Sequence, residues 1–161
     1  MKAFSWRVNR RPQNLRPAAL SAGHPSGAAY IEIAVRPLVL ASTSRYRHEL
    51  LARLEVAFIA AAPDFDERAE DPRFAELGAD AFAVRLAHGK AASLAGAHPD
   101  AWILAADQLA VLPGPPAEVL HKPGSEDQAI AQLMRLSGRT FALINGVTLL
   151  DARTGAFRDA V

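Results

Sequence analysis

The strongest constraint on the fold is an alternation of short apolar runs with helical patterns, which begins after Pro37. Short apolar runs bounded by turn residues indicate buried strands, whereas apolar residues three or four positions apart indicate helices. The predicted elements follow in chain order: a strand at 38–41, a helix from residue 45, a strand at 56–62, a helix at 80–94, a strand at 101–106, a helix at 125–136 and a hairpin from residue 141 onward. This order predicts an α/β fold, with helices flanking a sheet.

Several features of composition exclude whole classes of protein. The 161 residues suit one domain of ordinary size, and no apolar run approaches the roughly 18 residues of a membrane-spanning helix. The chain has no cysteine, which excludes disulfides, thiolate zinc sites and a cysteine nucleophile. Its five histidines show no metal-ligand spacing. We expect a cytoplasmic protein that uses neither a membrane nor stable nucleic-acid binding.

Charge divides the chain into a leader and a body. Residues 1–36 hold six basic residues and one acid, whereas residues 37–161 hold twelve basic and sixteen acidic residues. We predict that 1–36 is a basic, disordered leader or translated upstream sequence. An organelle transit segment and a nucleic-acid-binding arm are the alternatives. Because valine codons can serve as starts, Val35 is a candidate beginning of the true protein.

The first candidate site is the turn after the first predicted strand, Ser42-Thr43-Ser44. Ser44 is placed to cap a helix from Arg45, and the N-terminus of a helix favours an anion. Arg47 adds donors suited to phosphate oxygens. The alternative is a capped helix with surface arginines. The apolar face expected to turn inward in this helix consists of Tyr46, Leu50, Leu51 and Leu54.

Carboxylates gather in a second segment, Asp64-Phe65-Asp66-Glu67. Three carboxylates within four residues at the end of a strand suit a hard cation such as magnesium, with substrate phosphates as further ligands. The alternative is a solvated acidic loop.

A lysine lies on the stripe of the 80–94 helix that is expected to face the core. Phe82, Leu86 and Leu94 form this stripe, and Lys90 lies one turn after Leu86. A lysine in this position either extends to the edge of the core and reaches solvent, or meets an anion in a cleft.

Two further segments offer polar groups. Asp107-Gln108 directly follows an apolar run, and open α/β sheets place ligands and catalysts at the carboxyl ends of strands. Asp107 is therefore a candidate general base, or a cap for the following turn. Lys122 precedes Pro123 in a loop predicted over 111–123, and suits a phosphate contact. The cations Arg47, Lys90 and Lys122, with carboxylates from two segments, together suit a metal-bound polyphosphate.

The order of these motifs resembles the Maf nucleotide pyrophosphatases. The matching segments cover 37–161 and are Leu38-Val39-Leu40-Ala41-Ser42-Thr43-Ser44-x-x-Arg47-x-x-Leu50-Leu51, Asp64-Phe65-Asp66-Glu67, Leu86-Ala87-x-x-Lys90-Ala91, Ile103-Leu104-Ala105-Ala106-Asp107-Gln108, Lys122-Pro123, Leu136-Ser137-Gly138 and Asn145-Gly146-Val147. The resemblance implies a mixed, twisted sheet with flanking helices and a deep cleft, as in the Maf and ITPase-like proteins. It also implies hydrolysis of a nucleoside triphosphate to the monophosphate and pyrophosphate, in a domain that is incomplete at its C-terminus.

Roles for individual residues follow from the same resemblance. Asp107 matches the catalytic proton acceptor, and Glu67 with Asp107 matches the ligands of a divalent metal, Mg²⁺ or Mn²⁺. The substrate-binding positions are Ser42, Ser44, Tyr46, Arg47, Lys90, Gln108 and Lys122. The resemblance leaves room for a homodimer.

An aromatic residue before the signature arginine, with glutamine after the catalytic aspartate, looks like the 7-methyl-GTP pyrophosphatase subgroup. Tyr46 and Gln108 occupy these positions. An aromatic face attracts the positive charge of a methylated guanine, and an amide offers both a donor and an acceptor to a base edge. The alternatives are a dTTP/UTP pyrophosphatase of the same family, a non-catalytic nucleotide-binding regulator of cell division, and a degraded product without function.

Overall fold

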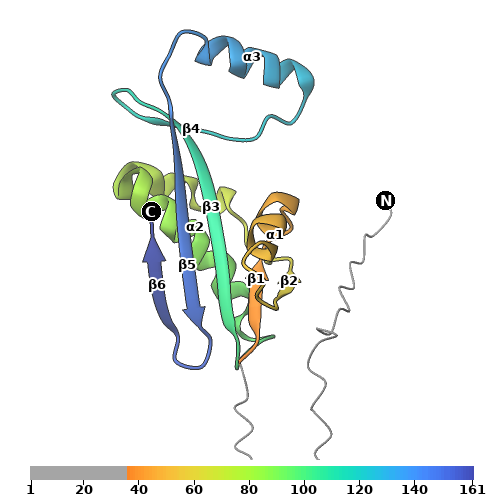
Figure 1. Cartoon of the computed structure of the whole chain (residues 1–161). Helices are drawn as coiled ribbons and strands as arrows, with labels where there is room; N and C mark the ends of the chain where they lie inside the picture. Colours follow the sequence, from red (N-terminus) through yellow and green to blue (C-terminus); the bar gives the residue numbers. More distant parts are fainter. Residues whose placement is uncertain (1–35) are drawn as a thin grey trace, which may run out of the picture. The chain divides into compact units, whose positions relative to one another are not determined.

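The computed structural model describes residues 36–161, so the predicted leader lies outside the described residues except for Arg36. The elements in chain order are β1 (Leu38–Ala41), α1 (Arg45–Ala52), β2 (Ile59–Ala61), the 3-10 helix η1 (Arg68–Arg73), α2 (Phe74–Ala95), β3 (Trp102–Leu112), β4 (Glu118–Leu120), α3 (Glu126–Leu136), β5 (Ala142–Asp151) and β6 (Ala156–Ala160). The predicted α/β class is confirmed. The strands form one mixed six-stranded sheet with flanking helices (Figure 1).

The strand order is β2-β1-β3-β5-β6, and β4 pairs with β3 outside this path. β1 is parallel to both β2 and β3, whereas β5 and β6 follow as antiparallel neighbours. The connections from β1 to β2 and from β2 to β3 run in opposite directions across the sheet. Since such crossovers are right-handed, α1 and α2 cover opposite faces.

β3 has one edge that is only partly paired. Residues 102–104 pair with β1, and residues 110–112 pair with β4. β5 pairs with β3 over residues 102–111, so β1 and β4 both lie on the other side of β3. Among the strands between residues 36 and 161, none pairs with residues 105–109 on that side. This open edge of β3 adjoins the turn that follows β1.

The core lies between the sheet and α2. Val39, Ala41, Ile103 and Ala105 pack with Ala91 of α2 in one buried cluster. The inward face predicted for the 80–94 helix is confirmed, because its three large apolar residues are all buried. Gly146 of β5 allows α2 to approach closely, since a Cβ there would lie 2.3 Å from the carbonyl carbon of Ala83.

The structure corrects several predicted boundaries. β2 covers only Ile59–Ala61 of the predicted 56–62 strand. α2 begins at Phe74 and bends at Gly78, which has a positive φ of 75°. β3 continues to Leu112, and β4 lies within the predicted 111–123 loop, because Leu109 and Val111 extend the buried face past the polar pair. The helix at Glu126–Leu136 and the hairpin are confirmed.

The inward face predicted for α1 is wrong. Only Leu51 of this helix is buried, whereas Tyr46, Leu50 and Leu54 are largely exposed. Among the described elements, none packs extensively against this helix. Most of the stripe therefore stays in contact with solvent. The cap is confirmed, because Ser44 Oγ accepts a hydrogen bond from the amide of Arg47 at 3.5 Å.

Among the helices between residues 36 and 161, none combines the length and apolar character that crossing a bilayer requires.

Candidate functional site

A buried lysine joins two carboxylates from distant segments. Lys90 of α2 and Asp107 of β3 are each only 6% exposed. The Lys90 Nζ donates to Asp107 Oδ1, and it also lies 2.8 Å from Glu67 Oε1. The lysine therefore does not extend to solvent. Its partners are two carboxylates of the protein itself, and an anion in a cleft stays a prediction. We call Glu67, Lys90 and Asp107 the charged triad.

Two contacts with α2 hold the segment Asp64-Phe65-Asp66-Glu67, which we call the acidic loop. The Ser93 hydroxyl accepts a hydrogen bond from the amide of Asp64 at 3.2 Å. Phe65 lies against Gly89, where a Cβ would come within 2.2 Å of the phenyl ring. These anchors place Glu67 beside the lysine one residue beyond Gly89. Neither anchor was predicted from the sequence, although a lone glycine within a helical pattern, here Gly89, often marks close packing.

The three carboxylates of the acidic loop do not act together. Asp66 Oδ1 accepts from the amides of Arg68 and Ala69 at 3.0 and 3.4 Å, so it caps η1. Asp64 is exposed and contributes its amide to an anchor. Only Glu67 reaches Lys90, with about half of its side chain exposed. Asp66 therefore serves local structure, and Glu67 alone represents this segment in the charged triad.

Asp107 does not lie at the end of a strand. It is the sixth residue of β3 and pairs with Gly146 in register. Asp107 faces α2, because Ile103, Ala105 and Leu109 on the same side of the strand pack into the α2 core. It also lies within the open edge of β3, between the residues that pair with β1 and those that pair with β4.

Gln108 faces the opposite side of the sheet from Asp107, since successive side chains of a strand alternate. It is exposed, and its Nε2 donates to Asn145 Oδ1 on β5 at 2.9 Å. In the sequence, Asn145 stands out only as part of the segment Asn145-Gly146-Val147, which carries the family resemblance. The pairing register that joins it to Gln108 was not accessible from the sequence.

The serine turn adjoins the open edge of β3. Ser42 is buried, and its Oγ accepts from the amide of Ser44 at 3.1 Å. Arg47 is half-buried, whereas Tyr46 in the first turn of α1 is 83% exposed. Within residues 36–161, neither a hydrogen bond nor an ion pair joins Tyr46 or Arg47 to the charged triad.

Lys122 lies farther along the chain, between β4 and α3. It is exposed and lines a hollow of about 340 Å³ together with Arg68, which directly follows Glu67. His121 Nε2 lies 3.1 Å from Asp71 Oδ2 and so connects this segment to η1. The structure thus brings the segment that carries Lys122 beside η1, with no direct contact from Lys122 to the charged triad among the described side chains.

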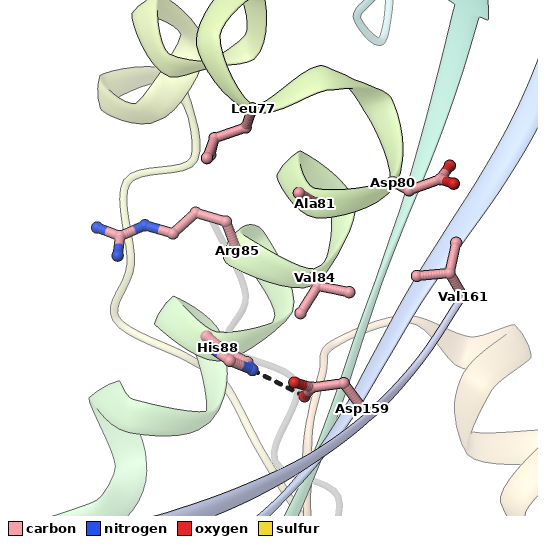
Figure 2. Close-up of a pocket in the computed structure, with 8 residues that line it drawn as sticks. All are labelled: Leu77, Asp80, Ala81, Val84, Arg85, His88, Asp159 and Val161. Atoms are coloured by element: carbon pink, nitrogen blue, oxygen red, sulfur yellow. Dashed lines mark hydrogen bonds and ion pairs between the residues drawn. The ribbon is translucent and has the colours of Figure 1, made fainter.

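A second hollow, of about 360 Å³, lies between α2 and β6 and contains none of the predicted site residues (Figure 2). His88 Nε2 lies 2.7 Å from Asp159 Oδ1, which also accepts from the buried Thr148 hydroxyl at 2.6 Å. Burial raises the pKa of Asp159, but the hydrogen bonds from Thr148 and His88 outweigh it and leave that pKa below its usual value. These contacts fasten β6 to α2.

The charged triad suits a divalent cation only in part. Its formal charge is one negative unit, from two carboxylates and one ammonium. Across the part of the chain that the structure describes, no three His, Cys, Asp or Glu side chains converge into a metal-binding group. Carboxylate oxygens are suitable ligands for Mg²⁺, which characteristically takes one or two of them together with substrate phosphates. Glu67 and Asp107 therefore fit such an ion in the presence of a polyphosphate.

Comparison with known proteins decides the family. The family profile described as Maf-like protein matches residues 37–160. The chain belongs to the Maf family. This Maf chain is 44% identical over 120 residues to a 7-methyl-GTP pyrophosphatase of Pseudomonas putida, covering 74% of the chain and 58% of that relative.

Two other relatives give a similar level of identity. A 7-methyl-GTP pyrophosphatase of Xanthomonas campestris is 45% identical over 116 residues, covering 70% of this chain and 55% of its own length. A dTTP/UTP pyrophosphatase of Myxococcus xanthus is 47% identical over 112 residues, covering 70% of the chain and 54% of its own length. The Maf chain thus spans little more than half the length of the curated relatives it matches.

Proposed function

We propose that this Maf chain carries the catalytic centre of a nucleoside triphosphate pyrophosphatase, a hydrolase that releases pyrophosphate and leaves the monophosphate. The observation that carries the proposal is the convergence of Glu67, Lys90 and Asp107 at the open edge of β3. These groups come from three segments and lie next to a turn with a capped helix N-terminus. The helix N-terminus suits the negative charge of a triphosphate, and the two carboxylates suit a divalent cation that would accompany it.

Lys90 forms ion pairs with both carboxylates of the charged triad. Without a nucleotide its ammonium is shared between Glu67 and Asp107. A triphosphate competes for this ammonium, because its oxygens carry several negative charges. Asp107 is then free to orient a water molecule and accept its proton. The water oxygen attacks the α-phosphorus, the bond from this phosphorus to the bridging oxygen breaks, and pyrophosphate leaves.

Glu67 and Asp107 would hold a Mg²⁺ or Mn²⁺ ion against the phosphates. When bound, the cation supplies positive charge that stabilises the oxygens of the transferring phosphoryl group. Lys90 contributes further positive charge from within the protein. We propose that Arg47 and Lys122 do the same at the ends of the phosphate chain, and that Ser42 and Ser44 line the turn that receives it.

Two features favour 7-methyl-GTP, or a related modified nucleotide, as the substrate. Two of the relatives above are named 7-methyl-GTP pyrophosphatases. Tyr46 presents an exposed aromatic ring that suits a cationic base, and Gln108 presents an amide. A dTTP/UTP pyrophosphatase is the second candidate, because the Myxococcus xanthus relative carries that name at 47% identity. The homodimer stays a prediction.

The Asp107→Asn variant tests the catalytic proposal. Asparagine keeps the size of the side chain but cannot accept the proton, so we expect turnover to fall about 10²–10⁴-fold. Nucleotide binding should survive, because Lys90 and Glu67 remain. The measurements are pyrophosphate release and nucleotide titration with Mg²⁺ present. Turnover equal to that of the unmodified chain would remove Asp107 from its role. A nucleotide-binding regulator, by contrast, would bind without releasing pyrophosphate in either form.

A further inference from the structure

An amide pair lies across β3 and β5 on the face of the sheet away from the charged triad. Gln108 Nε2 donates to Asn145 Oδ1 at 2.9 Å, and both residues are exposed. They are directly opposite each other in the strand register. The next residue, Gly146, is buried against the backbone of Ala83. This contact sets the backbone of β5 against α2 at the residue next to Asn145.

The amide pair and the charged triad lie on opposite faces of the sheet, and neighbouring residues of β3, Gln108 and Asp107, belong to the two groups. Asp107 faces α2, whereas Gln108 faces the side that carries α1. Along a strand, the backbone N–H and C=O groups of successive residues point alternately to its two edges. Trp102 N donates to Pro37 O on the side of β1, whereas Ala101 O accepts from Ala152 N on the side of β5. Gln108 is an even number of residues from Trp102, so its backbone groups point to the open edge on the side of β1. An elongated ligand that crosses this edge meets charged groups on one face and amides on the other.

We propose that Asn145 is a specificity-determining residue that orients the Gln108 amide toward the base of a bound nucleotide. This inference rests on the proposed function, because it places the triphosphate at the charged triad. The base then lies on the α1 face, the face of Tyr46. Asn145 acts through Gln108, and so it is a positioning residue with no part in the chemical step.

The chemistry of the pair favours a base edge with a carbonyl beside an N–H group. Asn145 Oδ1 holds one Nε2–H of Gln108, which leaves its Oε1 to accept and its second N–H to donate. Guanine offers O6 as an acceptor next to a ring N–H donor. Adenine offers the reverse pattern, an amino donor beside a ring acceptor. The fixed amide therefore selects 7-methylguanine over adenine, whereas a freely rotating amide would accept either base.

Three variants test this assignment. Asn145→Leu removes the acceptor at nearly constant size, and Asn145→Asp keeps an acceptor that can only receive a hydrogen bond. Leu143→Ala is the matched control, because Leu143 lies two residues away on the same face of β5 and is exposed. For each variant, kcat and KM are measured with 7-methyl-GTP and with ATP, and the ratio of the two kcat/KM values gives the selectivity.

We expect Asn145→Leu to lower this selectivity about tenfold, through a higher KM for 7-methyl-GTP with kcat little changed. Asn145→Asp should keep the selectivity near that of the unmodified chain. Gln108→Ala should lose the same selectivity, and Asn145→Leu should add nothing in that background. This non-additivity would not arise from a general loss of stability.

Different outcomes overturn the two proposals. Asn145→Leu with the selectivity of the Leu143→Ala control would overturn the assignment of Asn145 alone. If the unmodified chain binds 7-methyl-GTP but releases no pyrophosphate, the proposed reaction fails, and the same variants compared by equilibrium binding still decide the assignment. If it binds neither nucleotide, both proposals fail.

Discussion

Replacing Lys90 by methionine tests whether the charged triad is a buried ionic site. Methionine keeps the length of the side chain but removes the ammonium that serves Asp107, which is only 6% exposed. Removal of one partner from a buried ion pair costs about 3–5 kcal/mol, because the other charge stays buried without compensation. The loss of the ammonium costs less free energy at Glu67, because about half of its side chain is already exposed to solvent. We therefore expect Lys90→Met to lower the free energy of unfolding by about 3–5 kcal/mol.

Urea unfolding measures this loss as a lower midpoint at an unchanged slope. The control is Arg153→Met, because Arg153 pairs with Asp100 at 3.0 Å while both side chains are more than half exposed, at 59% and 73%. Exposed pairs contribute about 0–1 kcal/mol. If Lys90→Met cost no more than Arg153→Met, Asp107 would not carry a buried charge, and the electrostatic account of the site would be refuted.

Two further predictions concern stability. Gly146→Ala places a methyl group 2.3 Å from the Ala83 backbone, so we expect a loss of about 1–3 kcal/mol and a lower Tm, whereas Gly96→Ala, which meets no atom within 4 Å, should leave Tm nearly unchanged. The Arg36 guanidinium beside Asp151 lowers the pKa of that carboxyl from 3.8 to about 2. A lowered folded-state pKa stabilises the protein fully above about pH 4, and the effect is lost as the pH falls toward 2. Acid-unfolding curves should therefore show Arg36→Gln less stable than the unmodified chain at pH 5, with the difference shrinking toward pH 2.

Local periodicity in the sequence predicted the core-facing side of α2 but not that of α1. Lys90 lies at helical spacing from Leu86 and Leu94, and the long β3 and β5 strands provide a surface against which this stripe packs. The stripe of α1 has the same spacing. The two strands next to α1 in the chain are only four and three residues long, and Tyr46 and Leu50 stay exposed. Periodicity identifies the apolar face of a helix, but the extent of the opposing sheet decides how much of that face is buried.

The sequence also could not show how the site is assembled. Glu67 reaches Lys90 because Phe65 packs at Gly89, a contact that depends on the path of a loop rather than on any spacing. Asp107 was expected at the end of a strand, because the apolar run stops there. The strand continues, since Leu109 resumes the buried side of the alternation. A polar residue in the middle of a buried strand breaks the hydrophobic pattern just as a strand end does.

The position of Asp107 and Gln108 inside β3 determines which face of the sheet each side chain points to. At a strand end, Asp107 and Gln108 would belong to a flexible turn and could face the same ligand group. Within a strand, alternation forces them to opposite faces. A ligand reaches both only where the strand lacks a neighbour, and in the described part of the chain β3 lacks one over residues 105–109 on the side of β1. Under the proposed function, the gap between the β1 and β4 pairings would let this dipeptide contact both ends of a nucleotide, the phosphates through Asp107 and the base through Gln108.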